Sequence, residues 1–301
     1  MPFLRGPEKS VHTNTREVEV ALIAVIKLGG SVLTTPASYQ SAATFIAQRL
    51  AANATEHLVA VVSAQNGETD ALQREAQTIC AGPDEAALDL LWSTGELRSV
   101  ARLCLHLQAQ GVRAAALDVR QTGLRIAKRG AEISTAAFDS SAIRSALLRR
   151  RAVVVPGFLA TDATGNIATL GRGGSDLTAV IIAAGLGASR CELIKDVAGY
   201  FSADPRLHSN AKNLPRLSFA DALAMADAGC ELVQRDALLA AERWDLPLLV
   251  RSFDQRAAGT WVTRTHLSAV SVVSGVPLLA NSTSQQIAEE NFSKVQSADE
   301  N

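Results

Sequence analysis

Apolar runs and helical periodicities alternate along most of this chain. Continuous apolar runs lie at Val18–Leu28, His57–Ser63, Val112–Asp118, Ala152–Val155, Cys191–Ile194 and Pro247–Arg251. Apolar residues at helical spacing lie at Ser38–Asn53, Ala71–Cys80, Asp84–Gln110, Asp139–Arg151, Leu177–Leu186, Ser218–Asp227 and Glu231–Trp244. Apolar strands that alternate with helices are typical of a parallel sheet buried between helices. We therefore predict an α/β fold whose ligands bind beyond the carboxyl ends of the strands.

Other segments follow this pattern less closely. Gly157–Ala168 is predicted to form a β-hairpin with its turn at Asp162–Asn166, and the longest helix has a candidate break near Ser93–Gly95. Val270–Leu279 is a candidate strand. Residues 1–19 and the serine-rich C-terminal end are expected to be weakly ordered polar tails.

Composition and charge narrow the class of protein. The chain has 301 residues, of which 48% are hydrophobic and 20% charged, so it can bury a sizeable core. A net charge of -1 gives no indication of a nucleic-acid partner. No segment approaches the roughly 20 apolar residues of a membrane span, and the N-terminus lacks an apolar signal core. Arg144 and Arg149–Arg151 are interpreted as charges on a solvated helix end.

Cysteine and histidine spacing argues against a metal centre. The four cysteines are far apart and the five histidines show no ligand spacing. We expect small buried thiols, no metal ligands from the chain, and a reduced, cytoplasmic setting.

The glycine-rich turn at residues 171–176, Gly-Arg-Gly-Gly-Ser-Asp, precedes a helical pattern. Glycines let backbone N–H groups approach a ligand, and the helix N-terminus favours negative charge. Arg172 adds a planar fork that suits a carboxylate or phosphate, while Ser175 and Asp176 suit an N-cap or first turn. The same turn is compatible with an ordinary capped helix, so alone it leaves both interpretations open.

Lys27, Gly29 and Gly30 form a second candidate anion site at the end of the first strand. The alternative is a lysine at a strand edge followed by a turn. Glu96 lies in an otherwise apolar part of the longest helix, and its helix face is either solvated or part of a site.

Five runs of sequence occur together in one order. They are KLGGSV (27–32), VVSAQNGETDAL (61–72), LLWSTGELRS (90–99), PGFLATDATGNIATLGRGGSDLTA (156–179) and KDVAGYFSADPR (195–206). In order and spacing they resemble the motifs of aspartate kinases, within the amino-acid kinase superfamily. The resemblance covers roughly residues 20–265, and five motifs in order are specific where one would be weak.

This resemblance implies a three-layer α/β/α sandwich around a mostly parallel, eight-stranded sheet. It also implies transfer of the ATP γ-phosphoryl group to the side-chain carboxylate of L-aspartate, with Mg²⁺ accompanying the nucleotide, in lysine, threonine and methionine biosynthesis. Such chemistry depends mainly on stabilising charge, because a carboxylate is already a nucleophile.

Residue roles follow from the resemblance alone. The groups implied to stabilise the transferring phosphoryl group are Lys27, Gly29, Gly30 and Ser31. Those implied to bind the amino acid are Thr69, Glu96, Arg172, Ser175 and Asp176, with Arg172 on the α-carboxylate and Glu96 and Asp176 on the α-ammonium. Those implied on the nucleotide side are Lys195, Asp196, Phe201, Arg206 and Glu231.

The chain departs from the family pattern at two of these positions. Glu231 stands where the family usually has a lysine near the γ-phosphate, and Phe201 stands where a tyrosine is common. Either Arg235 or Lys195 supplies the missing positive charge, or Glu231 helps to hold a metal.

The third departure concerns the C-terminal small-molecule-sensing domains that the family usually carries and that we do not expect in this chain. We expect a flexible tail at 1–19, a catalytic domain at 20–268, and a truncated strand with a polar tail at 269–301, without built-in feedback inhibition. The resemblance implies a homodimer, and from charge and hydropathy we expect neither nucleic acid nor membrane as a partner. Two alternatives stay open: a kinase of another amino acid or carboxylate, and a catalytically silent nucleotide-binding homologue.

Overall fold

An eight-stranded sheet forms the centre of the fold. The computed structural model describes residues 22–127, 136–171, 173–253 and 259–264. Within them the strand order is β10-β12-β11-β9-β1-β2-β6-β3. These strands are β1 (Leu22–Leu28), β2 (Glu56–Val62), β3 (Ala114–Ala116), β6 (Ala152–Pro156), β9 (Cys191–Ile194), β10 (Arg216–Ser218), β11 (Leu248–Arg251) and β12 (Thr260–Thr263). Every pair is parallel except β11–β12, which confirms the predicted mostly parallel sheet.

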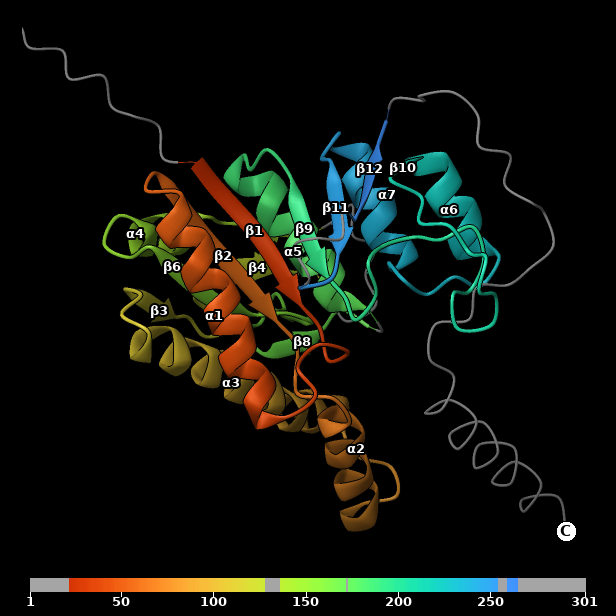
Figure 1. Cartoon of the computed structure of the whole chain (residues 1–301). Helices are drawn as coiled ribbons and strands as arrows, with labels where there is room; N and C mark the ends of the chain where they lie inside the picture. The colour runs from red at the N-terminus through yellow and green to blue at the C-terminus, as the bar shows by residue number, and fades with distance from the viewer. Residues whose placement is uncertain (1–21, 128–135, 172, 254–258, 265–301) are drawn as a thin grey trace, which may run out of the picture.

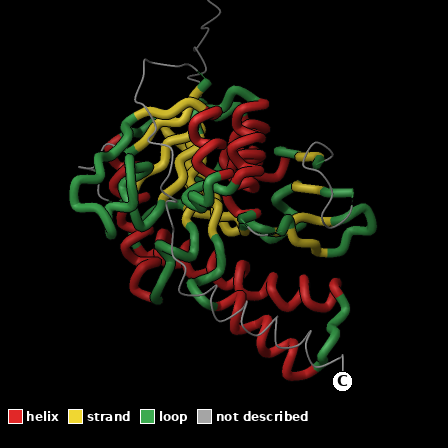
Figure 2. The backbone as a smooth tube through the Cα atoms, turned by 90° about the vertical axis from the view of Figure 1, so that its right-hand side faces the viewer, coloured by secondary structure: helices red, strands yellow, loops and turns green. Residues whose placement is uncertain are grey.

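Helices cover both faces of the sheet (Figures 1 and 2). They are α1 (Pro36–Ala52), α2 (Glu68–Ile79), α3 (Glu85–Ala109), α4 (Ser141–Leu147), α5 (Gly174–Leu186), α6 (Phe219–Asp227) and α7 (Arg235–Arg243). One apolar core joins the sheet to α1 and α3, and the other joins it to α4, α5, α6 and α7. This arrangement is the three-layer sandwich that the sequence predicts. Among the described residues, none of the helices combines the length and the apolar character that a membrane crossing requires.

A smaller sheet lies beside the large one. It has the order β5-β4-β7-β8, with β5 (Ala137–Phe138), β4 (Leu124–Arg125), β7 (Leu159–Thr161) and β8 (Ile167–Thr169). β7 and β8 pair antiparallel, and Asp162 N–H donates to the Asn166 carbonyl across the turn. The predicted hairpin is therefore confirmed.

Strand alternation decides which side chains face which helices. In β1, Val25 packs in the α5 core, whereas Ile26 and Leu28 pack in the α1 core. Because side chains alternate with a period of two, Lys27 faces α5. The same rule in β9 puts Leu193 on the α5 side and Ile194 on the α1 side.

The chain reverses its direction across the sheet between β1 and β9. From β1 the strands run outward through β2, β6 and β3, and the later strands β9, β11, β12 and β10 lie on the other side. In open parallel sheets the carboxyl ends of strands at such a switch point form the ligand crevice. The fold therefore points to the ends of β1 and β9.

The predicted break in the longest helix is wrong, since α3 is continuous from Glu85 to Ala109. Gly95 allows close packing instead, because a Cβ there would lie 3.2 Å from Ala64 Cβ and 3.3 Å from Glu68 Cγ. The last helix also differs from its prediction. It begins at Arg235 rather than Glu231, since Gln234 has extended backbone angles that a helix cannot continue through.

Two of the arginines interpreted as solvated charges hold the fold together. Arg151 donates to the carbonyls of Leu50, Asn53 and Glu56, which joins the start of β6 to the loop between α1 and β2. Arg144 donates to the carbonyl of Leu186 at the end of α5. The sequence could not show these roles of Arg144 and Arg151, because the carbonyl groups that they bind lie far away along the chain.

Gly187 provides a test of backbone conformation in the α5 layer. It ends α5 with φ of 69°, and a Cβ there would meet nothing within 4 Å. We expect Gly187→Ala to lower the free energy of unfolding by about 1 kcal/mol, because an L-residue is strained in the left-handed region. Urea unfolding would measure this, with Gly82→Ala as a control at an open position outside that region. Equal stabilities of the two variants would contradict the prediction.

Candidate functional site

Three charged side chains meet at the switch point. Nζ of Lys27 lies 2.7 Å from Oδ1 of Asp176, and Nζ of Lys195 lies 2.9 Å from Oδ2 of the same carboxylate. Lys27 belongs to β1, Lys195 directly follows β9, and Asp176 lies in the first turn of α5. All three side chains are buried. Strand alternation turns both lysines toward α5, which is why one carboxylate can bridge them.

The cluster carries two positive charges and one negative charge. Burial alone would raise the pKa of Asp176, but Lys195 and Lys27 outweigh it and hold that pKa well below its usual range. Burial lowers the pKa of Lys195, and repulsion from Lys27 lowers it further. The attraction of Asp176 raises this pKa but does not outweigh burial. The ionised carboxylate keeps both ammonium groups in place, and the excess of positive charge suits an anionic ligand.

The backbone after β1 lies directly beneath the Lys27 ammonium group. A Cβ at Gly29 would lie only 2.5 Å from Lys27 Nζ, so a side chain there would displace the ammonium group. The Gly29 carbonyl accepts hydrogen bonds from the N–H groups of Val32 and Leu33, which closes a tight turn through Gly30 and the half-buried Ser31. Glycine backbone beside a buried ammonium group is an arrangement that can bind a phosphoryl group.

Glu96 points inward from α3 and is only 3% exposed. Burial raises the pKa of Glu96 to about 8, and repulsion from Glu68 acts in the same direction. The Ala64 N–H and the charge of Lys27 lower this pKa but do not outweigh burial. Oε2 of Glu96 has no hydrogen-bond partner among the described residues. The solvated-face interpretation is therefore wrong for this residue, and a buried carboxylate with a strongly raised pKa is a typical feature of functional sites.

Ser175 lies beside Asp176 in the first turn of α5. Its hydroxyl lies 2.9 Å from the hydroxyl of Ser63, the residue that follows β2. A Cβ at Gly157 would lie 2.7 Å from Ser175 Cβ. Ser63 and Gly157 were not predicted as site residues. Two signals in the sequence pointed to them, because each follows a buried strand and lies within one of the five motif runs.

The glycine-rich turn leads directly into α5. Gly171 and Gly173 have φ of 82° and 73°, in the left-handed region that favours glycine. A side chain at Gly173 would overlap Gln234, which packs on the turn from the start of α7. Arg172, the predicted carboxylate-binding residue, lies outside the described residues.

The remaining predicted residues are not members of the three-residue cluster. Thr69 lies in the first turn of α2 rather than in a loop. Asp196 directly follows Lys195 and is exposed, and its negative charge raises the pKa of Lys195. Phe201 bridges to Asn213, and the exposed Arg206 pairs with the buried Asp204 at 3.1 Å.

Glu231 lies on the surface in the turn before α7. Of the two cations considered as substitutes for the family lysine, Arg235 pairs with Asp227 at 2.7 Å, and Lys195 belongs to the buried cluster. Among the described residues, no group of three or more His, Cys, Asp and Glu side chains could hold a metal ion.

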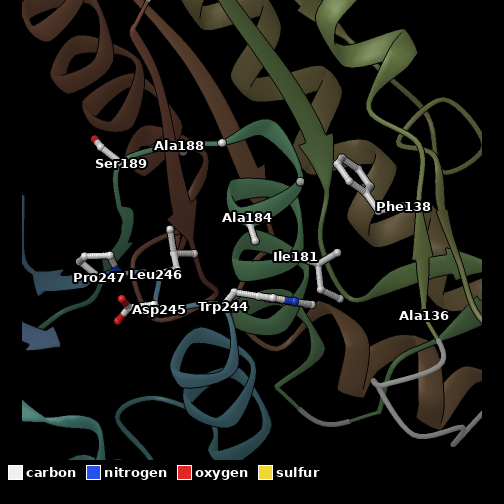
Figure 3. A pocket seen from close by; sticks show the side chains of 12 residues that line it. Ala136, Phe138, Ile181, Ala184, Ala188, Ser189, Trp244, Asp245, Leu246 and Pro247 are labelled. Atoms are coloured by element: carbon white, nitrogen blue, oxygen red, sulfur yellow. The ribbon is translucent and has the colours of Figure 1, made fainter. Parts of the chain in front are cut away.

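A cavity of about 620 Å³ lies elsewhere (Figure 3). It is lined mostly by apolar groups near the C-terminal ends of α5 and α7, among them Phe138, Ile181, Trp244 and Leu246. The predicted site lies at the opposite end of α5, so this cavity and the charged cluster are separate.

Comparisons with known proteins show which family the chain resembles. A model of the "Amino acid kinase family" matches residues 23–252. An aspartokinase of Geobacillus stearothermophilus is 37% identical over 205 residues, which are 68% of this chain and 50% of that protein. The chain thus spans about half the length of the curated relatives it matches.

Two solved structures are similar over most of the chain. Aspartate kinase from Synechocystis has a TM-score of 0.70 and 33% identity, covering 83% of this chain and 41% of that one. E. coli aspartokinase III, in complex with aspartate and ADP, has a TM-score of 0.67 and 27% identity. The match covers 82% of this chain and 65% of that one.

The raised pKa of Glu96 predicts a pH-dependent effect on stability. In the unfolded chain the carboxyl group ionises near pH 4.5, whereas in the fold it stays protonated up to about pH 8. Wild type therefore loses stability relative to Glu96→Gln as the pH rises through this window. We expect the advantage of the variant to grow by up to roughly 5 kcal/mol, since one pKa unit corresponds to ~1.4 kcal/mol. Denaturant unfolding at pH 4, 6 and 9 would measure it, with the exposed Glu75→Gln as control. A difference that does not change with pH would show the prediction to be wrong.

Proposed function

The chain belongs to the amino acid kinase family, and we propose that it transfers the γ-phosphoryl group of ATP to the side-chain carboxylate of L-aspartate, giving 4-phospho-L-aspartate. The observation that carries this proposal is the buried Lys27–Asp176–Lys195 cluster at the switch point. Relatives named aspartokinase, at 37% identity over about 70% of the chain, support aspartate as the acceptor.

Lys27 and the Gly29–Ser31 backbone are assigned to the transferring phosphoryl group. Charge builds on the oxygens of that group in the transition state, and fixed cations and N–H groups stabilise it. Asp176 holds the Lys27 ammonium group in one position, so it does not have to reorganise during transfer. A general base is not required, because the acceptor carboxylate is already ionised near neutral pH.

The amino-acid acceptor is assigned to groups on α2, α3 and the start of α5. Arg172 suits the α-carboxylate, Glu96 and Asp176 suit the α-ammonium group, and Thr69 and Ser175 add hydroxyl groups. Glu96 must lose its proton to attract the ammonium group, and a pKa of about 8 allows this at a modest cost near neutral pH. Oε2, which has no hydrogen-bond partner within the described part of the chain, is the atom that would accept from the ligand.

The nucleotide is assigned to the segment after β9 and the turn before α7. The residues that we assign to nucleotide binding are Lys195, Asp196, Phe201, Arg206 and Glu231. Mg²⁺ on the nucleotide would neutralise phosphate charge, and it commonly takes most of its ligands from phosphates and water. We therefore assign Mg²⁺ to the nucleotide rather than to a dedicated site in the protein.

The setting of the reaction is part of the same proposal. We assign the protein to the cytoplasm as a homodimer that acts in the biosynthesis of lysine, threonine and methionine. The free thiols of Cys104, Cys191 and Cys230 are buried and that of Cys80 is exposed, which fits a reducing compartment.

Hydroxylamine trapping of the acyl phosphate tests the reaction. We expect wild type to form the hydroxamate only with ATP, Mg²⁺ and L-aspartate together. Lys27→Ala should lower the rate by at least about 100-fold, because a preorganised charge on the phosphoryl group is lost. Calorimetric ATP binding by the variant would show that its fold persists. Wild type that binds ATP without forming product would overturn aspartate transfer, and product from another amino acid would reassign the acceptor.

Glu231 offers a second test, of the nucleotide side. We expect Glu231→Lys to raise kcat/KM for ATP by about fivefold at low salt, because a cation replaces a surface anion near the phosphates at ~1 kcal/mol. Asp236→Lys makes the same charge change in the exposed first turn of α7 and serves as the matched control. A fall in turnover for Glu231→Lys alone would mean that the glutamate has a role of its own.

A further inference from the structure

Asp89 is a buried carboxylate that no motif of the sequence singled out. It lies near the start of α3 and is only 2% exposed. One oxygen accepts from the Thr169 N–H at 3.2 Å, and the other accepts from the Thr169 hydroxyl at 3.1 Å. A buried carboxylate is costly unless it is hydrogen-bonded, so this contact holds two distant segments together.

Thr169 is the last residue of β8 and is fully buried. The next residue, Leu170, donates its N–H to the Phe158 carbonyl, and the left-handed glycines Gly171 and Gly173 follow. Glycines leave a turn with little stiffness of its own. The hold of Asp89 on Thr169 therefore fixes the point from which the chain enters the first turn of α5.

Asp89 and Glu96 share one face of the same helix. Buried residues recur along α3 at Asp89, Ser93, Glu96 and Val100, and two helical turns separate the two carboxylates. Helix α3 thus carries Glu96, and through Asp89 it also holds the segment that leads into Ser175 and Asp176.

We propose that Asp89 is a positioning residue, which keeps the glycine-rich entry to α5 in register with Glu96 so that both halves of the amino-acid site face one acceptor. This proposal rests on the proposed function for its catalytic consequence. The geometric consequence, a fixed turn, is independent of which substrate the enzyme takes.

Steady-state kinetics of Asp89→Asn, Thr169→Val and the double variant test the catalytic consequence. The Asp89→Asn change presents an amide N–H₂ group to one of the two donors, and the Thr169→Val change keeps the threonine shape without its hydroxyl group. We expect Asp89→Asn to raise the KM for L-aspartate by about 10-fold, with the KM for ATP within about twofold. The double variant should be no worse than the worse single variant, because both changes break one link.

Two further variants separate positioning from stability. Asp84→Ala removes the N-cap of the same helix, which accepts from the Ala86 and Ala87 N–H groups. It should lower the Tm without raising the KM for L-aspartate. Thr169→Ser keeps both donors and should retain the KM of wild type. Equal rises in both KM values, or a double variant whose effect is the product of the single effects, would overturn the proposal.

Hydrogen exchange provides the readout that does not require turnover. Asp89→Asn and Thr169→Val should speed exchange of the Gly173, Gly174 and Ser175 amides, while the α3 amides near Glu96 keep the protection of wild type. If wild type forms no product from L-aspartate, the proposed function fails, and the exchange result alone decides on Asp89. Unchanged exchange at these three amides in both variants would overturn the positioning role.

Discussion

The bridge from Asp176 to Lys27 and Lys195 is the interaction on which the rest of the site depends. Two buried ammonium groups on neighbouring strands would repel each other without the carboxylate between them. Asp176 is in the first turn of α5, where the helix dipole also favours its negative charge. Losing one member of such a buried group commonly costs roughly 3–5 kcal/mol, because an uncompensated charge remains. The same contact therefore stabilises the α5 layer and sets the charge of the ligand crevice.

Strand alternation separates this cluster from a second buried group of charges. Glu192 lies in β9, the strand that leads to Lys195, but it faces α1, where Arg49 Nη1 lies 2.9 Å away. Arg49 also pairs with Glu56 of β2 at 2.7 Å, so it ties α1 to two strands. On this face Arg190 and Arg251 also pair with Glu192, so each buried carboxylate has an arginine partner within the fold. The α5 face keeps an excess of positive charge at the crevice, and a ligand can compensate it.

Glu96 shows how one buried group can serve the fold and the ligand differently. In the free protein burial and the nearby Glu68 favour its neutral form, and they outweigh the opposing charge of Lys27. An ammonium group from the acceptor would favour the ionised form instead. Glu96 is therefore neutral in the free protein and would ionise only when a cation arrives, whereas the Lys27–Asp176–Lys195 cluster carries an excess of positive charge throughout.

The sequence by itself determined the class of the fold and most of its elements, but not the strands β10 and β12. Apolar runs located the central strands, helical spacing located the helices, and motif order pointed to the family, because these signals are local. It did not determine the uninterrupted α3, the start of α7, or the carbonyl contacts of Arg144 and Arg151. Nor could it show that residues 27, 176 and 195 meet at one carboxylate, that Glu96 is buried, or that Asp89 holds Thr169. Only the tertiary structure decided these, because local periodicity gives the face of an element but not the distant element that packs against it.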